Sequence, residues 1–211
     1  MNRADENLEI EIKLQLGNFT DYLKLIGFLG NIDAEDHQEN CFFDSEDRRL
    51  ATAGWALRVR VSDGKGLVTA KGMPSETSTA VVRQEIEAPI PRSAALDIVH
   101  LEADILDLSI EPIAFIKEKF PGIRLAKLLN FKTLRQQKNY KIGDYHYVLE
   151  IDKTEFADGS VDYELEIELP DTDRVITVED SLRKLFNSLA IPFQRQTESK
   201  FARALQHARI M

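Results

Sequence analysis

The chain has 211 residues, of which 43% are hydrophobic and 30% charged, and its formal net charge is −9. This balance is ordinary for a globular protein with a buried core, and the acidic excess argues against a general binder of nucleic acid or membrane surfaces. The single cysteine, Cys41, the lack of a long apolar run and the polar first residues lead us to expect a cytoplasmic protein with no internal disulfide.

Alternation of apolar and polar residues predicts about eight strands, nearly all antiparallel to their neighbours. The predicted strand regions are 8–16, 40–45, a hairpin over 55–72, 79–90, a second hairpin over 131–156 and 157–170. Turn chemistry supports the two hairpins at Asp63–Gly66 and near Gly143. A proline cannot donate to a central ladder, so Pro89 and Pro91 are expected to close the fourth region.

Helical spacing of apolar residues predicts five helices. The predicted ranges are 19–30, 92–106, 110–120, 174–190 and 197–210. Asn18 is the expected N-cap of the first helix and Gly30 its end. The sequence shows no repeat and no linker, so residues 1–211 are expected to form a single α+β domain.

The polar positions of these strands are unusually rich in charge. Because side chains two apart share a face of a strand, the residues that fall on the polar faces are Glu9, Glu11, Lys13, Arg58, Arg60, Lys71, Arg83, Glu85, Glu87, Glu150, Asp152, Glu164, Glu166 and Glu168. A solvated sheet face would also alternate in this way. However, like charges two apart repel unless a ligand between them takes up the charge.

Two types of ligand can neutralise the like charges on such a strand face. Hard cations such as Mg²⁺ and Mn²⁺ prefer carboxylate oxygens, whereas Arg and Lys hold phosphates. Acidic and basic clusters close together therefore indicate metal-assisted chemistry on a polyphosphate.

The order of the charged motifs resembles the CYTH domain family, the triphosphate tunnel metalloenzymes. The matching segments are EIEIK at residues 9–13, LRVR at 57–60, TAK at 69–71, RQEIE at 83–87, KTLR at 132–135, LEID at 149–152, YELEIE at 163–168 and ESKF at 198–201. The resemblance implies an eight-stranded antiparallel β-barrel whose charged face lines a tunnel and whose apolar face is covered by helices. Relatives in this family include thiamine triphosphatases, inorganic triphosphatases and class IV adenylyl cyclases.

The resemblance also implies roles for individual residues. The metal ligands would be Glu9, Glu11, Asp152, Glu166 and Glu168. Lys13, Glu85, Glu87 and Asp152 would act in catalysis, where Lys13 orients water or holds the terminal phosphate. The triphosphate would contact Lys13, Arg58, Arg60, Lys71, Arg83, Arg135 and Lys200. The orientation of Lys132, Glu150 and Glu164 stays open, because neighbouring candidates compete at these positions. Lys132 and Arg135, for example, differ in parity, so one of them faces away.

The function expected from this resemblance is hydrolysis of a triphosphate by water that is activated by Mg²⁺ or Mn²⁺. The seven expected basic and seven expected acidic residues nearly cancel, so a divalent ion is needed to make the tunnel attract a polyanion. The expected partner is a small-molecule triphosphate, with no nucleic acid or membrane, and the oligomeric state is open. Alternatives are a class IV adenylyl cyclase, a non-catalytic polyphosphate-binding module and an RNA 5′-triphosphatase.

Overall fold

The computed structural model describes residues 8–73, 75–76, 80–101 and 103–208. Its strands are β1 (Leu8–Leu16), β2 (Ala34–Asp44), β3 (Trp55–Val61), β4 (Gly66–Gly72), β5 (Ser75–Glu76), β6 (Val81–Ile90), β7 (Ala126–Ile142), β8 (Tyr145–Glu155), β9 (Val161–Glu168) and β10 (Gln194–Arg195). Its helices are α1 (Phe19–Leu29), α2 (Arg49–Thr52), α3 (Arg92–His100), α4 (Glu111–Lys119), α5 (Val175–Ser188) and α6 (Lys200–Ala208), with 3-10 turns at Ile105–Asp107 and Thr172–Arg174.

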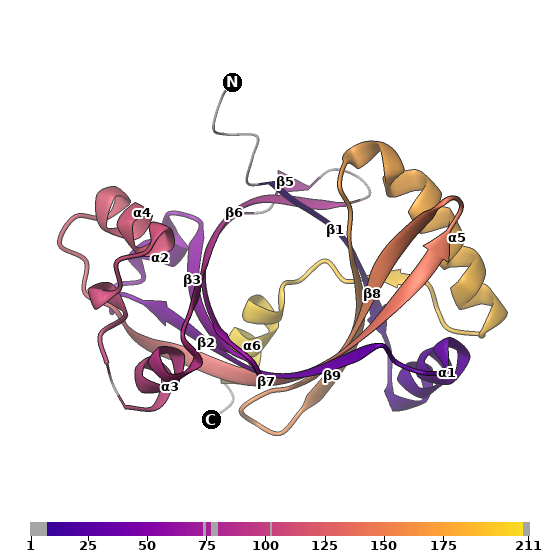
Figure 1. Ribbon diagram of the computed structural model, residues 1–211, viewed down its shortest axis with the longest axis horizontal. Helices are drawn as coiled ribbons and strands as arrows, with labels where there is room; N and C mark the ends of the chain where they lie inside the picture. The colour runs from indigo at the N-terminus through magenta and orange to yellow at the C-terminus, as the bar shows by residue number, and fades with distance from the viewer. Residues whose placement is uncertain (1–7, 74, 77–79, 102, 209–211) are drawn as a thin grey trace.

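Eight of the described strands close into an antiparallel ring (Figure 1). The order around the ring is β1, β9, β8, β7, β2, β3, β4 and β6, and β1 completes the circuit by pairing with both β9 and β6. Glu11 therefore lies opposite Glu168 on one side, and Glu9 lies opposite Arg83 on the other. The expected eight-stranded antiparallel α+β architecture is confirmed.

The outward face of the ring is apolar and is covered by helices on two sides. On one side α1 and α5 pack over β1, β8 and β9, where Leu14, Leu25 and Phe186 are fully buried. On the opposite side α2, α3 and α4 pack over β3, β4 and β6, with Val59 and Ile116 among the buried residues. Strands covered by these helices thus turn most of their apolar side chains outward, which leaves the charged side chains to face inward.

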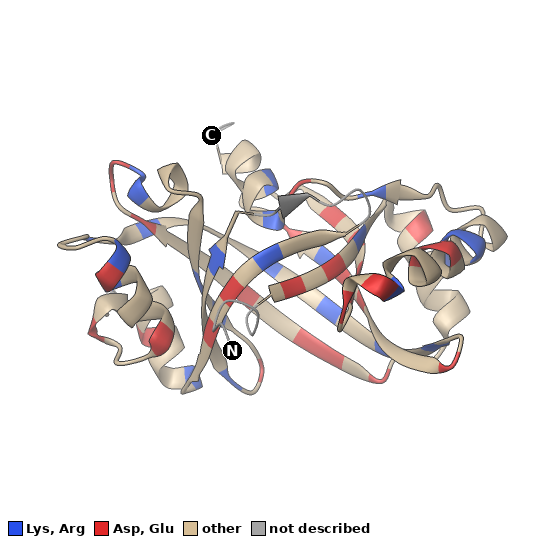
Figure 2. Cartoon of the chain, turned by 90° about the horizontal axis from the view of Figure 1, so that it is seen from above, with Lys and Arg blue, Asp and Glu red and all other residues tan. Residues whose placement is uncertain are grey.

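Helix α6 lies across one end of the ring (Figures 1 and 2). Phe201 stacks on Phe42 of β2 with ring centroids 4.6 Å apart, and Ala204 packs in the same apolar cluster as Phe131 and Phe156. This cluster differs from the two helix-covered cores because Phe42 and Phe131 share the faces of β2 and β7 that point into the ring. It therefore fixes α6 against the interior.

Several element boundaries differ from the sequence prediction. Strand β2 begins at Ala34 rather than at residue 40, and β7 begins at Ala126 rather than at residue 131. The predicted helix over 92–106 ends at His100. Strand β6 continues through Pro89, where it pairs with β4.

The terminal helix α6 runs from Lys200 to Ala208. The first residue of the predicted fourth strand region, Thr79, and the last two of the predicted final helix lie outside the described residues. Among the described residues, no helix is long and apolar enough to cross a membrane.

Side-chain hydrogen bonds to backbone amides fix the start of α1 and the loop before α2. The Asn18 side chain accepts a hydrogen bond from the Asp21 amide, as expected of an N-cap, and Gly30 ends α1 at φ 68°. Asp44 is buried and accepts hydrogen bonds from the amides of Ser45, Leu50 and Ala51. Asp44 therefore anchors the loop that leads into α2.

Candidate active site

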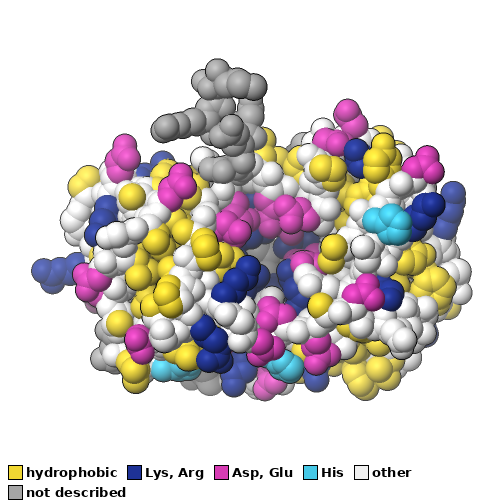
Figure 3. Space-filling view, viewed as in Figure 1, with side chains coloured by type: hydrophobic (Ala, Val, Ile, Leu, Met, Phe, Trp, Pro, Cys, Tyr) yellow, Lys and Arg dark blue, Asp and Glu magenta, His cyan; other side chains and the backbone are white. Residues whose placement is uncertain are grey.

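The interior of the ring is a cavity of about 790 Å³. Every predicted site residue lines it, namely Glu9, Glu11, Lys13, Arg58, Arg60, Lys71, Arg83, Glu85, Glu87, Arg135, Asp152, Glu166, Glu168 and Lys200. Figure 2 shows charged residues spaced along the crossing strands, and Figure 3 shows acidic and basic side chains around a central hollow. The alternation along each strand has thus brought residues far apart in sequence to one internal surface.

The structure places the three residues whose orientation was open. Glu150 lines the cavity and accepts a hydrogen bond from Gln137 at 2.8 Å. Glu164 is 1% exposed and lies beside Glu166 and Asp152. Lys132 is exposed, because its parity on β7 is opposite to that of the inward-facing Arg135.

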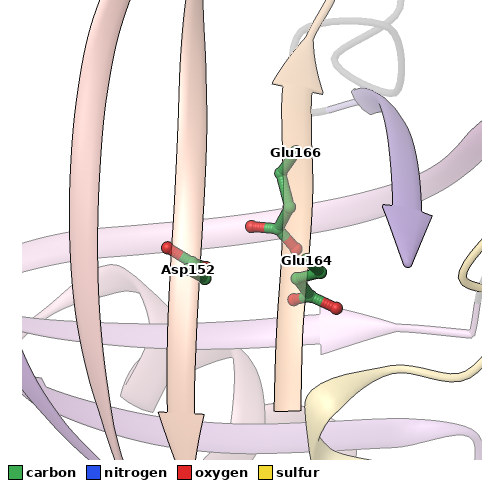
Figure 4. Close-up of side chains that lie close together, drawn as sticks. All are labelled: Asp152, Glu164 and Glu166. Carbon is green, nitrogen blue, oxygen red and sulfur yellow. The ribbon is translucent and has the colours of Figure 1, made fainter. Parts of the chain in front are cut away.

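A buried acidic cluster occupies the wall formed by β8 and β9 (Figure 4). One carboxylate oxygen from each of Asp152, Glu164 and Glu166 lies within 4.8 Å of the others. Arg135 binds Asp152 in a bidentate manner, with Nε–Oδ1 at 2.8 Å and Nη2–Oδ2 at 2.6 Å, and it also contacts Glu166. Burial opposes ionisation of Asp152, but the charges of Lys200 and Arg135 keep its pKa below the usual value.

A second set of ion pairs connects this cluster to β1. Lys13 Nζ lies 3.1 Å from Glu11 Oε2 and 2.7 Å from Glu166 Oε1. Arg83 donates to both Glu9 and Glu11 at 2.6 Å. Arg83 therefore holds the carboxylates of β1 from the neighbouring strand β6, and Lys13, on β1 itself, links Glu11 to Glu166 of β9.

A third group links β1, β4 and β6. Lys71 Nζ lies 2.8 Å from Glu85 Oε2 and 3.1 Å from Glu9 Oε2. Burial raises the pKa of Glu85 to about 7; the Lys71 charge opposes this rise, and a hydrogen bond with Glu9 adds to it. Two carboxyl groups in contact, one of which retains a proton near neutrality, form a site whose affinity for cations depends on pH.

Arg58 and Arg60 differ from the other cavity cations because neither forms an ion pair with any described residue. Arg58 Nη2 donates to Thr69 Oγ1 at 3.1 Å, while its buried Nε has no hydrogen-bond partner in the described part of the chain. Arg60 Nε donates to Asn40 Oδ1 at 3.0 Å. Burial, with the charges of Arg58 and Arg135, lowers the pKa of Arg60 to about 9. Two neighbouring guanidinium groups, one buried and one half-buried, that lack a carboxylate partner form a site for an anion.

The carboxylates of the cavity fit a divalent cation. Glu168 forms no ion pair among the described residues, and its pKa is raised by burial and by the charges of Glu9, Glu150 and Glu11. A cation between such carboxylates relieves this repulsion, and an all-oxygen donor set suits Mg²⁺ or Mn²⁺.

Sequence reasoning missed two kinds of site residue. Neutral residues on inward faces, such as Asn40 and Thr69, hold the unpaired arginines, and strand parity would have identified them. Arg203 on α6 binds Glu164 at 2.8 Å, and its position one turn after Lys200 was the available signal.

Comparison with known proteins places this fold and cavity in a family. Residues 7–204 match the CYTH domain model. Comparison with curated proteins gave no match.

Three solved structures share the fold. HpAC1 from Hippeastrum, described as an adenylyl cyclase candidate with a dominant triphosphatase activity, has a TM-score of 0.84 and 24% identity over 94% of this chain and 96% of that chain. An adenylate cyclase candidate from Bacillus halodurans has a TM-score of 0.69 and 21% identity over 93% and 98% of the two chains. The PH1819 protein from Pyrococcus horikoshii OT3 has a TM-score of 0.60 and 15% identity over 93% and 99%. Because the family match spans nearly the whole sequence, the chain belongs to the CYTH domain family.

Proposed function

We propose that this chain is a divalent-metal-dependent triphosphatase that cleaves the terminal phosphoanhydride of an inorganic or organic triphosphate inside the ring. The observation that carries the proposal is a pair of arginines without a carboxylate partner among the described residues, the buried Arg58 and the half-buried Arg60, which share a cavity with a buried carboxylate cluster. The guanidinium groups supply anion contacts, and the carboxylates supply ligands for a hard cation.

The cationic residues divide into two groups by what they contact. Arg58 and Arg60 are held by neutral acceptors, so their charge is available to phosphate oxygens. Lys13, Lys71, Arg83, Arg135 and Lys200 are paired with carboxylates. We infer that Arg58 and Arg60 make the first contacts with the triphosphate. The paired cations would contact phosphate oxygens once their carboxylates bind metal.

Glu9, Glu11, Asp152, Glu166 and Glu168 would hold the metal ion. Bound there, a divalent cation supplies positive charge to phosphate oxygens and lowers the pKa of a bound water. Lys13 lies between Glu11 and Glu166, where it would contact the terminal phosphate or orient the water. Glu85 and Glu87 line the same cavity and would help to position that water.

The proposal needs no covalent intermediate. Phosphoryl transfer depends mainly on positioning and on stabilisation of charge, and a closed ring of strands holds its inward side chains rigidly. The dominant triphosphatase activity described for HpAC1 agrees with this interpretation. An adenylyl cyclase on the same scaffold would bind the triphosphate through similar contacts but would release pyrophosphate and cyclic AMP.

Product analysis separates these activities. The purified protein is incubated with inorganic triphosphate or with ATP in Mg²⁺, Mn²⁺ or EDTA, and phosphate, pyrophosphate and cyclic AMP are quantified. Metal-dependent phosphate release that is lost in Glu11→Gln supports the triphosphatase. Formation of cyclic AMP and pyrophosphate from ATP would indicate an adenylyl cyclase instead of a triphosphatase. Tight triphosphate binding without turnover would indicate a binding module.

A further inference from the structure

Lys200 reaches the cavity from a helix rather than from a strand of the ring. It is the first residue of α6, and its ammonium group meets the buried cluster, with Nζ 2.8 Å from Asp152 Oδ2 and 3.0 Å from Glu166 Oε1. It also contacts Glu164 Oε1. The position of this ammonium group therefore depends on how the first turn of α6 is attached to the ring.

Arg203 makes that attachment. Its Nη2 lies 2.8 Å from Glu164 Oε2, and its Nε lies 2.7 Å from Asp162 Oδ2 on the same strand. Its Nη1 donates to the Glu198 carbonyl oxygen at 2.7 Å, in the segment just before the helix. Arg203 is 6% exposed and Glu164 1% exposed, so the contact between these two residues is shielded from solvent.

The two oxygens of Glu164 are shared between Lys200 and Arg203. One oxygen contacts the Lys200 ammonium and the other contacts the Arg203 guanidinium. In the described part of the chain these are the two cations that contact Glu164. Without Arg203, the full charge of a carboxylate that is 1% exposed would be left to Lys200 alone.

We propose that Arg203 is a positioning residue for the triphosphatase reaction: by binding Glu164 and Asp162 it fixes the first turn of α6, and so holds the Lys200 ammonium group in the cavity at the position from which it contacts substrate phosphate. Arg203 acts through Lys200 and does not itself line the cavity. The inference rests on the proposed function, because it assigns Lys200 a contact with the triphosphate.

The first test is a double-mutant comparison of KM and kcat for inorganic triphosphate with Mg²⁺. Arg203→Met is expected to raise KM about tenfold or more, the effect of losing one charge-assisted hydrogen bond. In a Lys200→Met background the same substitution is expected to change KM by less than about twofold, because residues that act as one unit are not additive. Multiplicative effects of the two substitutions would overturn the proposal.

The matched control is Arg183→Met. Arg183 is also a helical arginine that binds a carboxylate, with Nη2 2.8 Å from Glu179 Oε1, but both residues lie on α5 and Arg183 does not line the cavity. Its kinetic constants are expected to match those of the wild type. An equal KM increase in this control would show that loss of any such pair disturbs the enzyme, and would contradict a specific role for Arg203.

The second test does not require turnover. Amine-reactive labelling of the substrate-free protein, read by peptide mass spectrometry, reports the accessibility of Lys200, and Lys13, whose side chain is 9% exposed, serves as the internal reference. Arg203→Met is expected to increase the Lys200 labelling rate about tenfold while Lys13 is unchanged. Unchanged Lys200 labelling would overturn the proposal.

The two tests separate this inference from the proposed function. If the wild type does not hydrolyse any triphosphate, the proposed function fails, and the labelling result alone decides whether Arg203 positions Lys200. If Lys13 is also labelled faster in Arg203→Met, that variant is unfolded. Arg203→Gln, which keeps hydrogen-bonding groups, then replaces it under the same criteria.

Discussion

Replacement of Arg58 by methionine is expected to stabilise the free protein and to impair its activity. Arg58 is 9% exposed, and its Nε lacks a partner among the described residues. A buried donor without a partner costs about 1–3 kcal/mol, and an apolar side chain of similar length removes that cost. The attraction of Glu85 and Glu9 offsets part of the gain. We therefore expect the free energy of unfolding to rise by about 1–2 kcal/mol, or about 2–8 °C in Tm for a chain of this size.

The comparison variant is Arg135→Met, for which the same physical reasoning predicts the opposite sign. Arg135 binds Asp152, which is fully buried, and also contacts Glu150 and Glu166. Loss of one partner of a buried pair leaves an uncompensated charge and costs about 3–5 kcal/mol. Methionine substitutions of two arginines on one internal surface are thus expected to change the free energy of unfolding in opposite directions.

Activity should fall in the Arg58 variant despite its higher stability. Loss of one preorganised cation at a phosphoryl-transfer site lowers kcat/KM by about 100-fold. Stability is measured by urea unfolding in EDTA with the fluorescence of the single tryptophan, and activity by phosphate release. An Arg58→Met protein that is less stable than the wild type, or that retains full activity, would refute the interpretation of Arg58 as an unpaired, substrate-binding cation.

Three further predictions concern other parts of the chain. Gly66→Ala would place a Cβ 2.5 Å from the Ala95 Cβ of α3, so we expect a loss of about 1–3 kcal/mol in urea unfolding, whereas Gly64→Ala, with nothing within 4 Å, should be nearly neutral. Burial raises the pKa of Cys41 to about 11, so the neutral thiol contributes its full stabilisation below the unfolded pKa and loses it as the pH rises to about 11. Between pH 8.5 and 11 the free energy of unfolding of Cys41→Ala should therefore fall by about 3 kcal/mol less than that of the wild type, and equal pH slopes would contradict this. Glu168→Gln should reduce the rise in Tm that Mg²⁺ produces, and a full rise in this variant would exclude Glu168 from the metal site.

The alternation of residues in single strands predicted most of the fold. In β1 the charged residues face inward and Ile12 and Leu14 are buried outward, so the period of two alone identified both surfaces. The same pattern identified the hairpins of β3 with β4 and of β7 with β8. The closure of the ring could not be derived from any one strand, because it depends on β1 pairing with both β9 and β6. The family resemblance supplied that closure.

The features that the sequence did not reveal have identifiable physical causes. Residues 35–39 of β2 are polar and, apart from Gln38, exposed or half-buried, so they show no apolar alternation. The 92–106 segment keeps helical spacing beyond His100, yet Leu101 is exposed and the chain forms a 3-10 turn at 105–107. Arg203 was missed because its partners, Glu164 and Asp162, lie on a strand far away in sequence.

The most direct test of the central claim is phosphate release from inorganic triphosphate measured against free Mg²⁺ concentration, for the wild type and for Glu11→Gln. The wild type is expected to be inactive in EDTA and to reach a saturating rate as Mg²⁺ rises. Glu11→Gln should need a higher Mg²⁺ concentration and reach a lower rate, because a carboxylate of the metal site has lost its charge. Equal rates in EDTA and Mg²⁺, or no release at any concentration of Mg²⁺ or Mn²⁺, would contradict a metal-dependent triphosphatase in the charged interior of the ring.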